Sequence, residues 1–411
     1  MVSGREVIDP SQYSLIKSDK PNISDIFLAL PRGLASAADL VFCFLIIGGA
    51  IGVLSKVGLI EAMIYKLVRV SKIPSLILIA ILMVFFAIGG GTLGIAGEII
   101  LFLPGLLIFA KRFGYDEITG SSIAILGAGA GVSGAFICPF NIGLAQQLAG
   151  LPLYSALGFR LIVWLTLTTV TILYVIRYAR RHRITPKVIS EDEIHHCRNA
   201  KLLFMLLGAG IIMIAVGTIK LKWGLKEMSA AYFAIAICIG VAGRLTATDT
   251  ASAFADGASR MVTAALVVGL ARSVSLILEK ANVIDTILHS LAGSIQNLPG
   301  GAQAGGIFVF QLIVSFVIPS DSGQAVLTIP ILAPLGDIVG VTRQTVVLSY
   351  QFGDSFSNVL SPNVGYFIAA LSVVNISWSK WAKFVLPLFF IWCLIGLVFT
   401  LIAYYIHLGP F

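Results

Sequence analysis

The sequence predicts an all-α polytopic membrane protein made of two inverted repeats, and two observations predict it. First, 58% of the 411 residues are hydrophobic and 12% are charged, with a mean hydropathy of +0.97, which lies outside the range of soluble globular domains. Second, four short segments recur in the same order 223 to 226 residues later. Matching apolar segments broken by Gly or Pro are typical of secondary transporters and indicate where the binding site lies.

Eight apolar runs supply most of the hydrophobicity, and several are long enough to cross a hydrocarbon core of about 30 Å. They are Leu34–Leu54, Ile73–Ile88, Leu161–Val175, Leu202–Ile219, Ala230–Gly243, Met261–Leu278, Ile307–Ile318 and Phe384–Ile406. The net charge of +8 is not evidence of nucleic-acid binding, because the Lys and Arg residues gather in a few loops, as membrane topology predicts. We expect a multi-pass protein of the bacterial plasma (inner) membrane whose partners are the lipid bilayer and a small-molecule substrate.

The duplication divides the chain into five parts. These are an N-terminal segment with an interfacial helix (residues 1–33), a first repeat (34–180), a basic cytoplasmic linker (181–200), two connecting transmembrane helices (201–245) and a second repeat (246–411). Each repeat is expected to hold a spanning helix, a surface helix, a re-entrant hairpin, a broken transmembrane helix and a last span. Because the first copy begins outside and ends inside, and two helices follow, the second copy begins inside and the repeats are inverted.

Each repeat contains two predicted breaks. The first hairpin is expected to break at Gly89–Glu98, where five of ten residues are Gly, each costing about 0.5–1 kcal/mol relative to Ala in a helix. The second hairpin breaks at Pro319–Gln324. The broken helices are interrupted at Cys138–Asn141 and at Ser361–Asn363. Non-helical backbone is tolerated at membrane depth where protein or a cavity surrounds it, so these four breaks predict the site.

The candidate site residues are the polar groups at these breaks, where acids inside apolar segments cost a few kcal/mol to insert and are usually functional. They are Gly90, Gly91, Thr92, Glu98, Cys138, Pro139, Asn141, Ser320, Asp321, Ser322, Gly323, Gln324, Asp354, Asn358, Ser361, Pro362 and Asn363. The structural alternatives are a surface loop capped by Ser320 and Asp321, an interfacial helix cap at Glu98, and ordinary helix–helix hydrogen bonds around Asp354.

Three other motifs have simpler explanations. Gly129–Gly134 matches a dinucleotide-binding pattern, yet small residues at this spacing in a membrane segment more often mediate close packing. Gly131–Gly134 resembles the nucleophile segment of intramembrane serine proteases, but it lacks a partner because every His lies in a loop, a surface segment or at the extreme end of the chain. The His195–Cys197 cluster lies in a charged loop without a second ligand pair, so no metal site is expected. The sequence predicts no cofactor beyond a coupling Na⁺ or H⁺, and no enzymatic activity.

Several of these motifs occur together in one family. The Gly-rich tip with Glu98, Phe102–Pro104, Phe113–Asp116, the Gly-Ala-Gly-x-Gly run and Pro139–Asn141 resemble the YfcC-type carriers of the C4-dicarboxylate anaerobic carrier group. The same holds for Ser322–Ala325, Pro330, Ala333–Leu335 and Gln351–Asp354. That group is similar to the divalent-anion/sodium symporters of the ion transporter superfamily. The resemblance implies a scaffold domain, a moving transport domain, elevator-type alternating access and a homodimer.

The chain also departs from the family pattern. Members usually begin with one more transmembrane helix ahead of the Ile23 region, and they tend to carry a pair of acids at the first tip and Gly at the second. Here Gly97 precedes a single Glu98, and Asp321 stands where Gly is common.

The family is associated with C4-dicarboxylates or with exchange of basic amino acids. The predicted tips hold Glu98, Asp321 and Asp354 but no Lys or Arg, since Lys111, Arg112 and Arg343 lie at segment ends. Acids attract a cationic cargo, so basic amino acid exchange is favoured over a Na⁺- or H⁺-coupled C4-dicarboxylate carrier. An ion channel and an intramembrane hydrolase are the less favoured alternatives.

Overall fold

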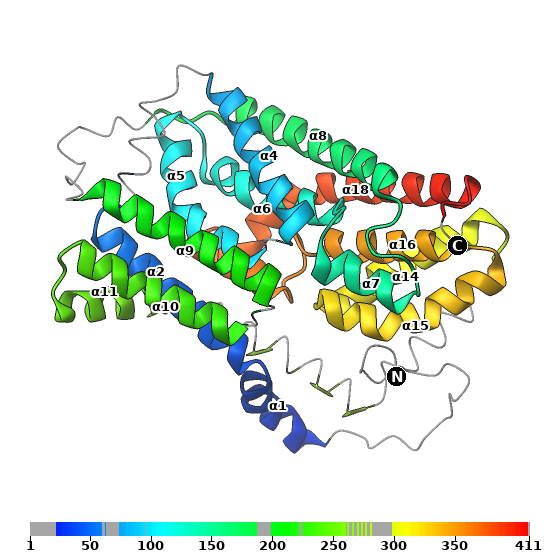
Figure 1. The fold of residues 1–411 in the computed structure, drawn as a ribbon, viewed down its shortest axis with the longest axis horizontal. Coiled ribbons are helices and arrows are strands. Elements are labelled where there is room, and N and C mark those ends of the chain that lie inside the picture. Colours follow the sequence, from blue (N-terminus) through cyan, green and yellow to red (C-terminus); the bar gives the residue numbers. More distant parts are fainter. Residues whose placement is uncertain are drawn as a thin grey trace.

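Two groups of helices make up the part of the chain that the structure, a computed structural model, describes (Figure 1). That part is residues 22–59, 62, 74–94, 96–186, 199–221, 223, 225–259 and 298–409, with alternating short stretches between 261 and 281. Within it the chain is helical, and its one β-bridge joins Tyr115 to Arg183. The expectation of an all-α fold is confirmed for these residues.

The first group is centred on α2. It comprises α1 (Ile23–Ser36), α2 (Ala38–Lys56), α9 (Ala200–Leu221), α10 (Leu225–Ala242) and α11 (Ala247–Ser259). Helices α10 and α11 pack along α2, and α9 packs on α10. Glycines allow the close contact of α2 with α11, because a Cβ at Gly52 would overlap the Ala253 carbonyl oxygen. We call this group the α2 bundle.

The second group holds the hairpin and broken-helix parts of the two predicted repeats, residues 75–181 and 301–405. We call this group the duplicated bundle and these two parts its halves. Its first half runs through α4 (Ser75–Leu93), η2 (Gly97–Phe102), α5 (Leu103–Arg112), α6 (Glu117–Ser133), the π-helix η3 (Pro139–Gly143), α7 (Leu144–Leu148) and α8 (Leu157–Arg181). Its second half runs through α14 (Gly301–Val317), α15 (Asp321–Val339), α16 (Arg343–Ser357), α17 (Gly365–Val373) and α18 (Trp378–Tyr405). Elements at matching positions in the two halves have matching partners: α4 packs on α6 and α8, as α14 packs on α16 and α18.

In each half, the segment that follows the break packs against the other half. Helix α17, which follows the break after α16, packs against η2 and α5 of the first half. In return, η3 and α7, which follow the break after α6, pack against α15 of the second half. Helices α6 and α16 touch directly between these contacts. The breaks are therefore enclosed by the opposite half, which is the condition for non-helical backbone within a membrane.

The helix breaks within the expected range Gly89–Glu98, but the break is shorter than expected. Helix α4 continues through Gly89–Gly91 to Leu93, and the chain turns at Gly94, which has a φ of +68°. The reason is packing against α6: a Cβ at Gly90 would overlap the Ala128 carbonyl oxygen, and one at Gly131 would overlap that of Ala87. Close helix contact offsets the low helix propensity of Gly, and it also confirms the packing interpretation of the Gly129–Gly134 motif.

Other boundaries differ from the expectation or lie outside the described residues. The interfacial helix at Ile23–Ala29 extends to Ser36, and α11 is a separate helix ahead of the expected span Met261–Leu278, which is described only in part. The predicted surface helices at 56–72 and 284–291 lie almost wholly outside the described residues.

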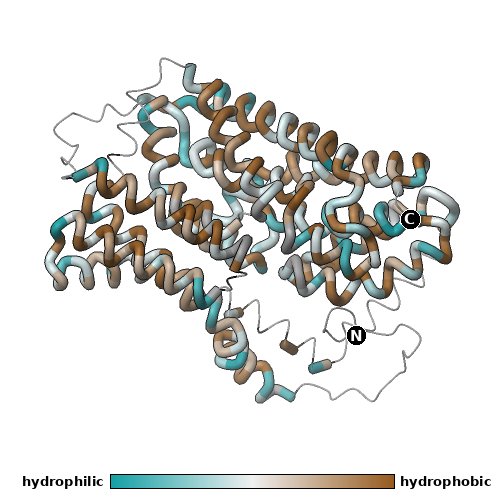
Figure 2. The backbone as a smooth tube through the Cα atoms, in the orientation of Figure 1, coloured by the Kyte–Doolittle hydropathy of each residue, from teal (hydrophilic) through white to brown (hydrophobic). Residues whose placement is uncertain are grey.

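Three described helices are long and apolar enough to cross a membrane by length and composition: Ser75–Thr92, Leu157–Arg181 and Trp378–Tyr405. The pair Ser24–Ser36 and Val41–Lys56, bent by 58°, makes a fourth if it is one span. Hydrophobic residues run along these helices in Figure 2, and large apolar side chains are exposed on single helix faces. On α4 these are Ile77, Ile81, Phe85 and Ile88. Exposed apolar faces of this kind suit contact with lipid, as in a multi-pass membrane protein.

Replacing Gly131 by Ala should lower the thermal unfolding midpoint in detergent, because the added Cβ has no room against Ala87 and overpacking costs about 1–3 kcal/mol. Gly208→Ala in α9 is the matched control, since a Cβ there meets nothing within 4 Å. The control should be neutral or slightly stabilised, because Ala favours a helix by about 0.5–1 kcal/mol over Gly. Equal midpoints for the two variants would contradict the close α4–α6 contact.

Candidate functional site

The polar centre of the duplicated bundle lies where α16 passes η3. Asn141 of η3 donates from Nδ2 to Asp354 Oδ2 at 3.2 Å and to Ser355 Oγ at 3.5 Å. Asn141 and Asp354 are each about 1% exposed, although 213 residues separate them in the chain. The structure thus brings together two of the predicted site residues, one from each half. A π-helical turn such as η3 is frequently found at a functional site.

The second broken segment contributes to the same region. Asn363 donates from Nδ2 to the Phe316 carbonyl oxygen at 3.0 Å, and its backbone N–H donates to Ser361 Oγ at 3.3 Å. Ser361 and Asn358 are buried, whereas Pro362 is exposed. Asn363 thereby satisfies the Phe316 carbonyl oxygen at the end of α14, where the helix stops and no further helical N–H group can donate to it. Its side chain is occupied in holding the hairpin.

The second hairpin is held together by amide side chains. Gln324 of α15 donates from Nε2 to the Gln311 carbonyl oxygen at 2.8 Å and to Gln311 Oε1 at 2.7 Å. Thr328 adds a hydrogen bond to Gln311 Oε1 at 3.1 Å, and all three side chains are buried. At the tip, Ser320 caps α15 by accepting from the Gly323 N–H at 3.2 Å. Gln324, Ser320 and Gly323 therefore have structural contacts, while the side chains of Asp321 and Ser322 lie outside the described residues.

The first hairpin places its predicted residues in packing contacts. Thr92 donates to the Ile88 carbonyl oxygen of its own helix at 2.7 Å, and Gly90 lies against α6. The Gly91 carbonyl oxygen accepts from the Phe136 N–H at 3.1 Å, which ties the end of α4 to the break after α6. Cys138 is buried beside Gly94. The side chains of Glu98 and Pro139 lie outside the described residues.

A buried cation near the centre was not predicted from the sequence. Arg160 in the first turn of α8 is about 1% exposed and donates to Gln351 Oε1 and, at 3.3 Å, to Gln344 Oε1. Gln351 lies one helical turn before Asp354, so the expectation of a centre with acids and no nearby Lys or Arg is wrong. The sequence does not reveal this role of Arg160. The residue directly precedes the apolar run Leu161–Val175, and a basic residue at such a position suggests a membrane boundary.

Gln351 links this cation to the break after α6. Its Nε2 donates to the carbonyl oxygens of Ser133 and Ala135, both at 3.0 Å. One amide side chain thus satisfies the carbonyl end of α6 while its own oxygen accepts from Arg160. The Gln351–Asp354 motif was noted in the sequence, but its contacts are 191 to 218 residues away along the chain.

The arrangement can bind a small polar or charged group. Asn141 Oδ1, Gln324 Oε1, Ser133 Oγ and Arg160 Nε are buried and have no hydrogen-bond partner among the described residues. Buried polar atoms of this kind are normally satisfied by water, an ion or a ligand. Within the described part of the chain no three His, Cys, Asp or Glu residues cluster as metal ligands. The chemistry is that of amide oxygens, one carboxylate and one guanidinium.

Comparison with known proteins places the chain in a family. The model of the C4-dicarboxylate anaerobic carrier family, DcuC, matches residues 7–405. The chain belongs to the DcuC family. The resemblance to YfcC-type carriers of this group is therefore confirmed, and the chain is a multi-pass membrane protein of a transporter family.

Two known proteins align over most of this chain. The Escherichia coli (strain K12) protein named "Putative basic amino acid antiporter YfcC" is 30% identical over 424 residues, covering 92% of this chain and 84% of the relative. A Haemophilus influenzae Rd protein is 29% identical, covering 96% and 81%. Among solved structures, the Alcanivorax borkumensis YdaH transporter is 17% identical with a TM-score of 0.48, covering 97% of this chain and 92% of that one.

Asn141→Ala should destabilise the protein by about 1.5–3 kcal/mol, because it removes a hydrogen bond to a buried carboxylate. A double-mutant cycle with Asp354→Asn, followed by unfolding in mixed detergent micelles, should give a coupling energy of about 0.5–3 kcal/mol. Gln147→Ala on the exposed face of α7 is the matched control and should not couple to Asp354. Additive effects of the Asn141 and Asp354 changes would contradict a direct contact between them.

Proposed function

We propose that this DcuC-family protein is a secondary active transporter that moves a small polar metabolite, an amino acid, across the bacterial inner membrane, with exchange of basic amino acids favoured. The observation that carries the proposal is the buried Asn141–Asp354 contact, where the two halves meet inside a mainly apolar bundle. An intramembrane carboxylate facing a bundle interior commonly marks the path of a substrate, an ion or a proton. Asp354 is the candidate group for a coupling Na⁺ or H⁺.

The charge content of the centre supports an amino acid. An α-amino acid carries a carboxylate and an ammonium group. The centre offers an opposite charge to each: the guanidinium of Arg160, which donates to Gln351 of α16, and the carboxylate of Asp354, one turn further along α16. The name of the Escherichia coli relative agrees with this cargo. The second candidate is a C4-dicarboxylate, favoured by the family description and by Arg160, which offsets the repulsion that Asp354 alone would exert on a dianion.

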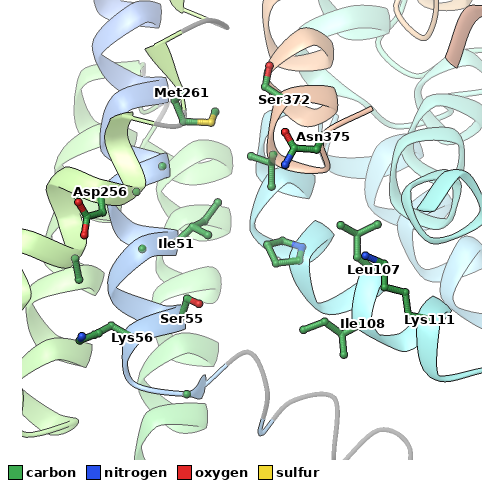
Figure 3. A pocket seen from close by; sticks show the side chains of 17 residues that line it. Ile51, Ser55, Lys56, Leu107, Ile108, Lys111, Asp256, Met261, Ser372 and Asn375 are labelled. Atoms are coloured by element: carbon green, nitrogen blue, oxygen red, sulfur yellow. The ribbon is translucent and has the colours of Figure 1, made fainter. Parts of the chain in front are cut away.

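We infer further that the halves are inverted repeats and that transport is of the elevator type. The matching partners of α4 and α14, and the exchange of α17 and α7 between the halves, support the repeats. A crevice of about 880 Å³ between the two bundles supports relative movement. Figure 3 shows Leu107, Ile108 and Lys111 of α5 on one wall, across from Ile51 and Ser55 of α2 on the other. In this proposal the α2 bundle is the scaffold, which also forms the homodimer, and the duplicated bundle moves.

The cargo is tested with purified protein by thermal shift and by counterflow in proteoliposomes, using arginine, ornithine, succinate and fumarate with and without Na⁺. Arginine or ornithine should raise the unfolding midpoint and give saturable counterflow, because a carrier exchanges bound cargo across the membrane. By mass action, a ligand at 100 times its Kd stabilises by about 2.7 kcal/mol.

If succinate or fumarate alone stabilised the protein and gave counterflow, the cargo would be a C4-dicarboxylate and not an amino acid. Flux without saturation or counterflow would contradict a carrier and favour a pore.

A further inference from the structure

Arg160 is a fully buried cation whose hydrogen-bond partners are neutral. Its two described partners are the amide oxygens of Gln351 and Gln344. Among the described residues no carboxylate lies within ion-pair distance of its guanidinium, whereas Arg32, Lys111, Lys226, Lys280 and Arg343 all have an acidic partner. Burying a charge without a counter-charge is expensive, because neutral ligands replace only part of its hydration. The position therefore needs an anion that the described part of the chain does not supply.

The free edge of the guanidinium indicates what that anion is. Nε has no hydrogen-bond partner among the described residues, and Nη2 beside it makes one long hydrogen bond of 3.3 Å to Gln344. Nε–H and one Nη2–H form the flat edge that grips a carboxylate with two parallel hydrogen bonds. The nearby Ser133 Oγ is also buried and without a partner among the described residues, and its backbone oxygen accepts from the same Gln351.

The place of Arg160 connects it to the candidate site. Gln351, which accepts from Arg160, and Asp354, which accepts from Asn141, are three residues apart on α16, and side chains at this spacing lie about 5–6 Å apart on one helix face. Ser133 Oγ, Asn141 Oδ1 and Arg160 Nε are buried without a partner in the part of the chain that the structure describes, and each belongs to a residue that hydrogen-bonds Gln351 or Asp354. A ligand at this turn would meet positive charge at one end and negative charge at the other.

We propose that Arg160 is the residue that binds a carboxylate of the transported cargo. This inference rests on the carrier function proposed above. The carboxylate is the chemistry shared by the two candidate cargoes, since an α-amino acid and a C4-dicarboxylate both carry it. Asp354 and Asn141 receive the other end of an amino acid. Arg160 also donates to Gln351, whose Nε2 holds the carbonyl oxygens of Ser133 and Ala135, and that hydrogen bond does not by itself require a positive charge.

The test compares three cargoes in proteoliposomes: arginine, agmatine and succinate. Agmatine keeps the guanidino side chain and amine of arginine but has no carboxylate. Wild-type protein should take up arginine or succinate and discriminate at least tenfold against agmatine. Arg160→Gln should raise KM for the carboxylate-bearing cargo at least tenfold and abolish the discrimination, and Arg160→Lys should restore part of it. Arg177→Gln, an exposed arginine on the same helix, should behave as wild type.

A merely structural role would lower the maximal rate for every cargo and leave KM and the discrimination ratio unchanged, and that result would overturn the proposal. If Arg160→Gln does not fold, Arg160→Lys decides, because it keeps the charge but loses the two-point grip: an unchanged ratio overturns the proposal and a reduced one supports it. Thermal shift distinguishes a failure of the proposed transport function from a failure of the role proposed for Arg160. Stabilisation of wild type by neither arginine nor succinate would overturn the proposed function, whereas equal stabilisation of wild type and Arg160→Gln would overturn the assignment of Arg160 alone.

Discussion

The structure depends on satisfying the backbone carbonyl groups that each broken helix leaves inside the membrane. Three helix ends show how this is done. The end of α4 is met by the Phe136 N–H, the end of α6 by the Gln351 side chain, and the end of α14 by the Asn363 side chain. Because an unsatisfied polar group in hydrocarbon costs several kcal/mol, these three contacts fix how the hairpins, the broken helices and the two halves fit together.

This constraint separates the polar residues into two sets. Thr328 and Asn363 use their donors to hold a hairpin arm and a helix end, so their polar groups stabilise the fold itself. Asn141 and Arg160 also bridge elements, yet each keeps a buried atom without a partner among the described residues. Incomplete satisfaction in an otherwise satisfied core is typical of a place that a ligand, ion or water completes. We therefore propose the place where α16 meets η3 and α8 as the site of function.

Sequence reasoning could predict the elements because the signals are local. Pro319, Pro139 and Pro362 lack a backbone N–H and lie at breaks between helices, and the duplication predicts that α4 corresponds to α14 and α6 to α16. It failed where distant contacts decide. The Gly89–Gly91 run stays helical because α6 packs against it, and Arg160 belongs to the centre because Gln351, 191 residues away, accepts its hydrogen bond. A single sequence contains no record of such pairs, so it predicted an acidic centre where the structure has charges of both signs.

The central claim is that cargo binds at the Gln351–Asp354 turn of α16, between η3 and the first turn of α8. The most direct measurement is a cryo-electron microscopy map of the protein with saturating cargo, compared with a map recorded without it. We predict added density touching Asn141, Asp354 and Arg160. Added density confined to the crevice lined by Ile51, Leu107 and Met261, with the α16 turn unchanged, would contradict the account.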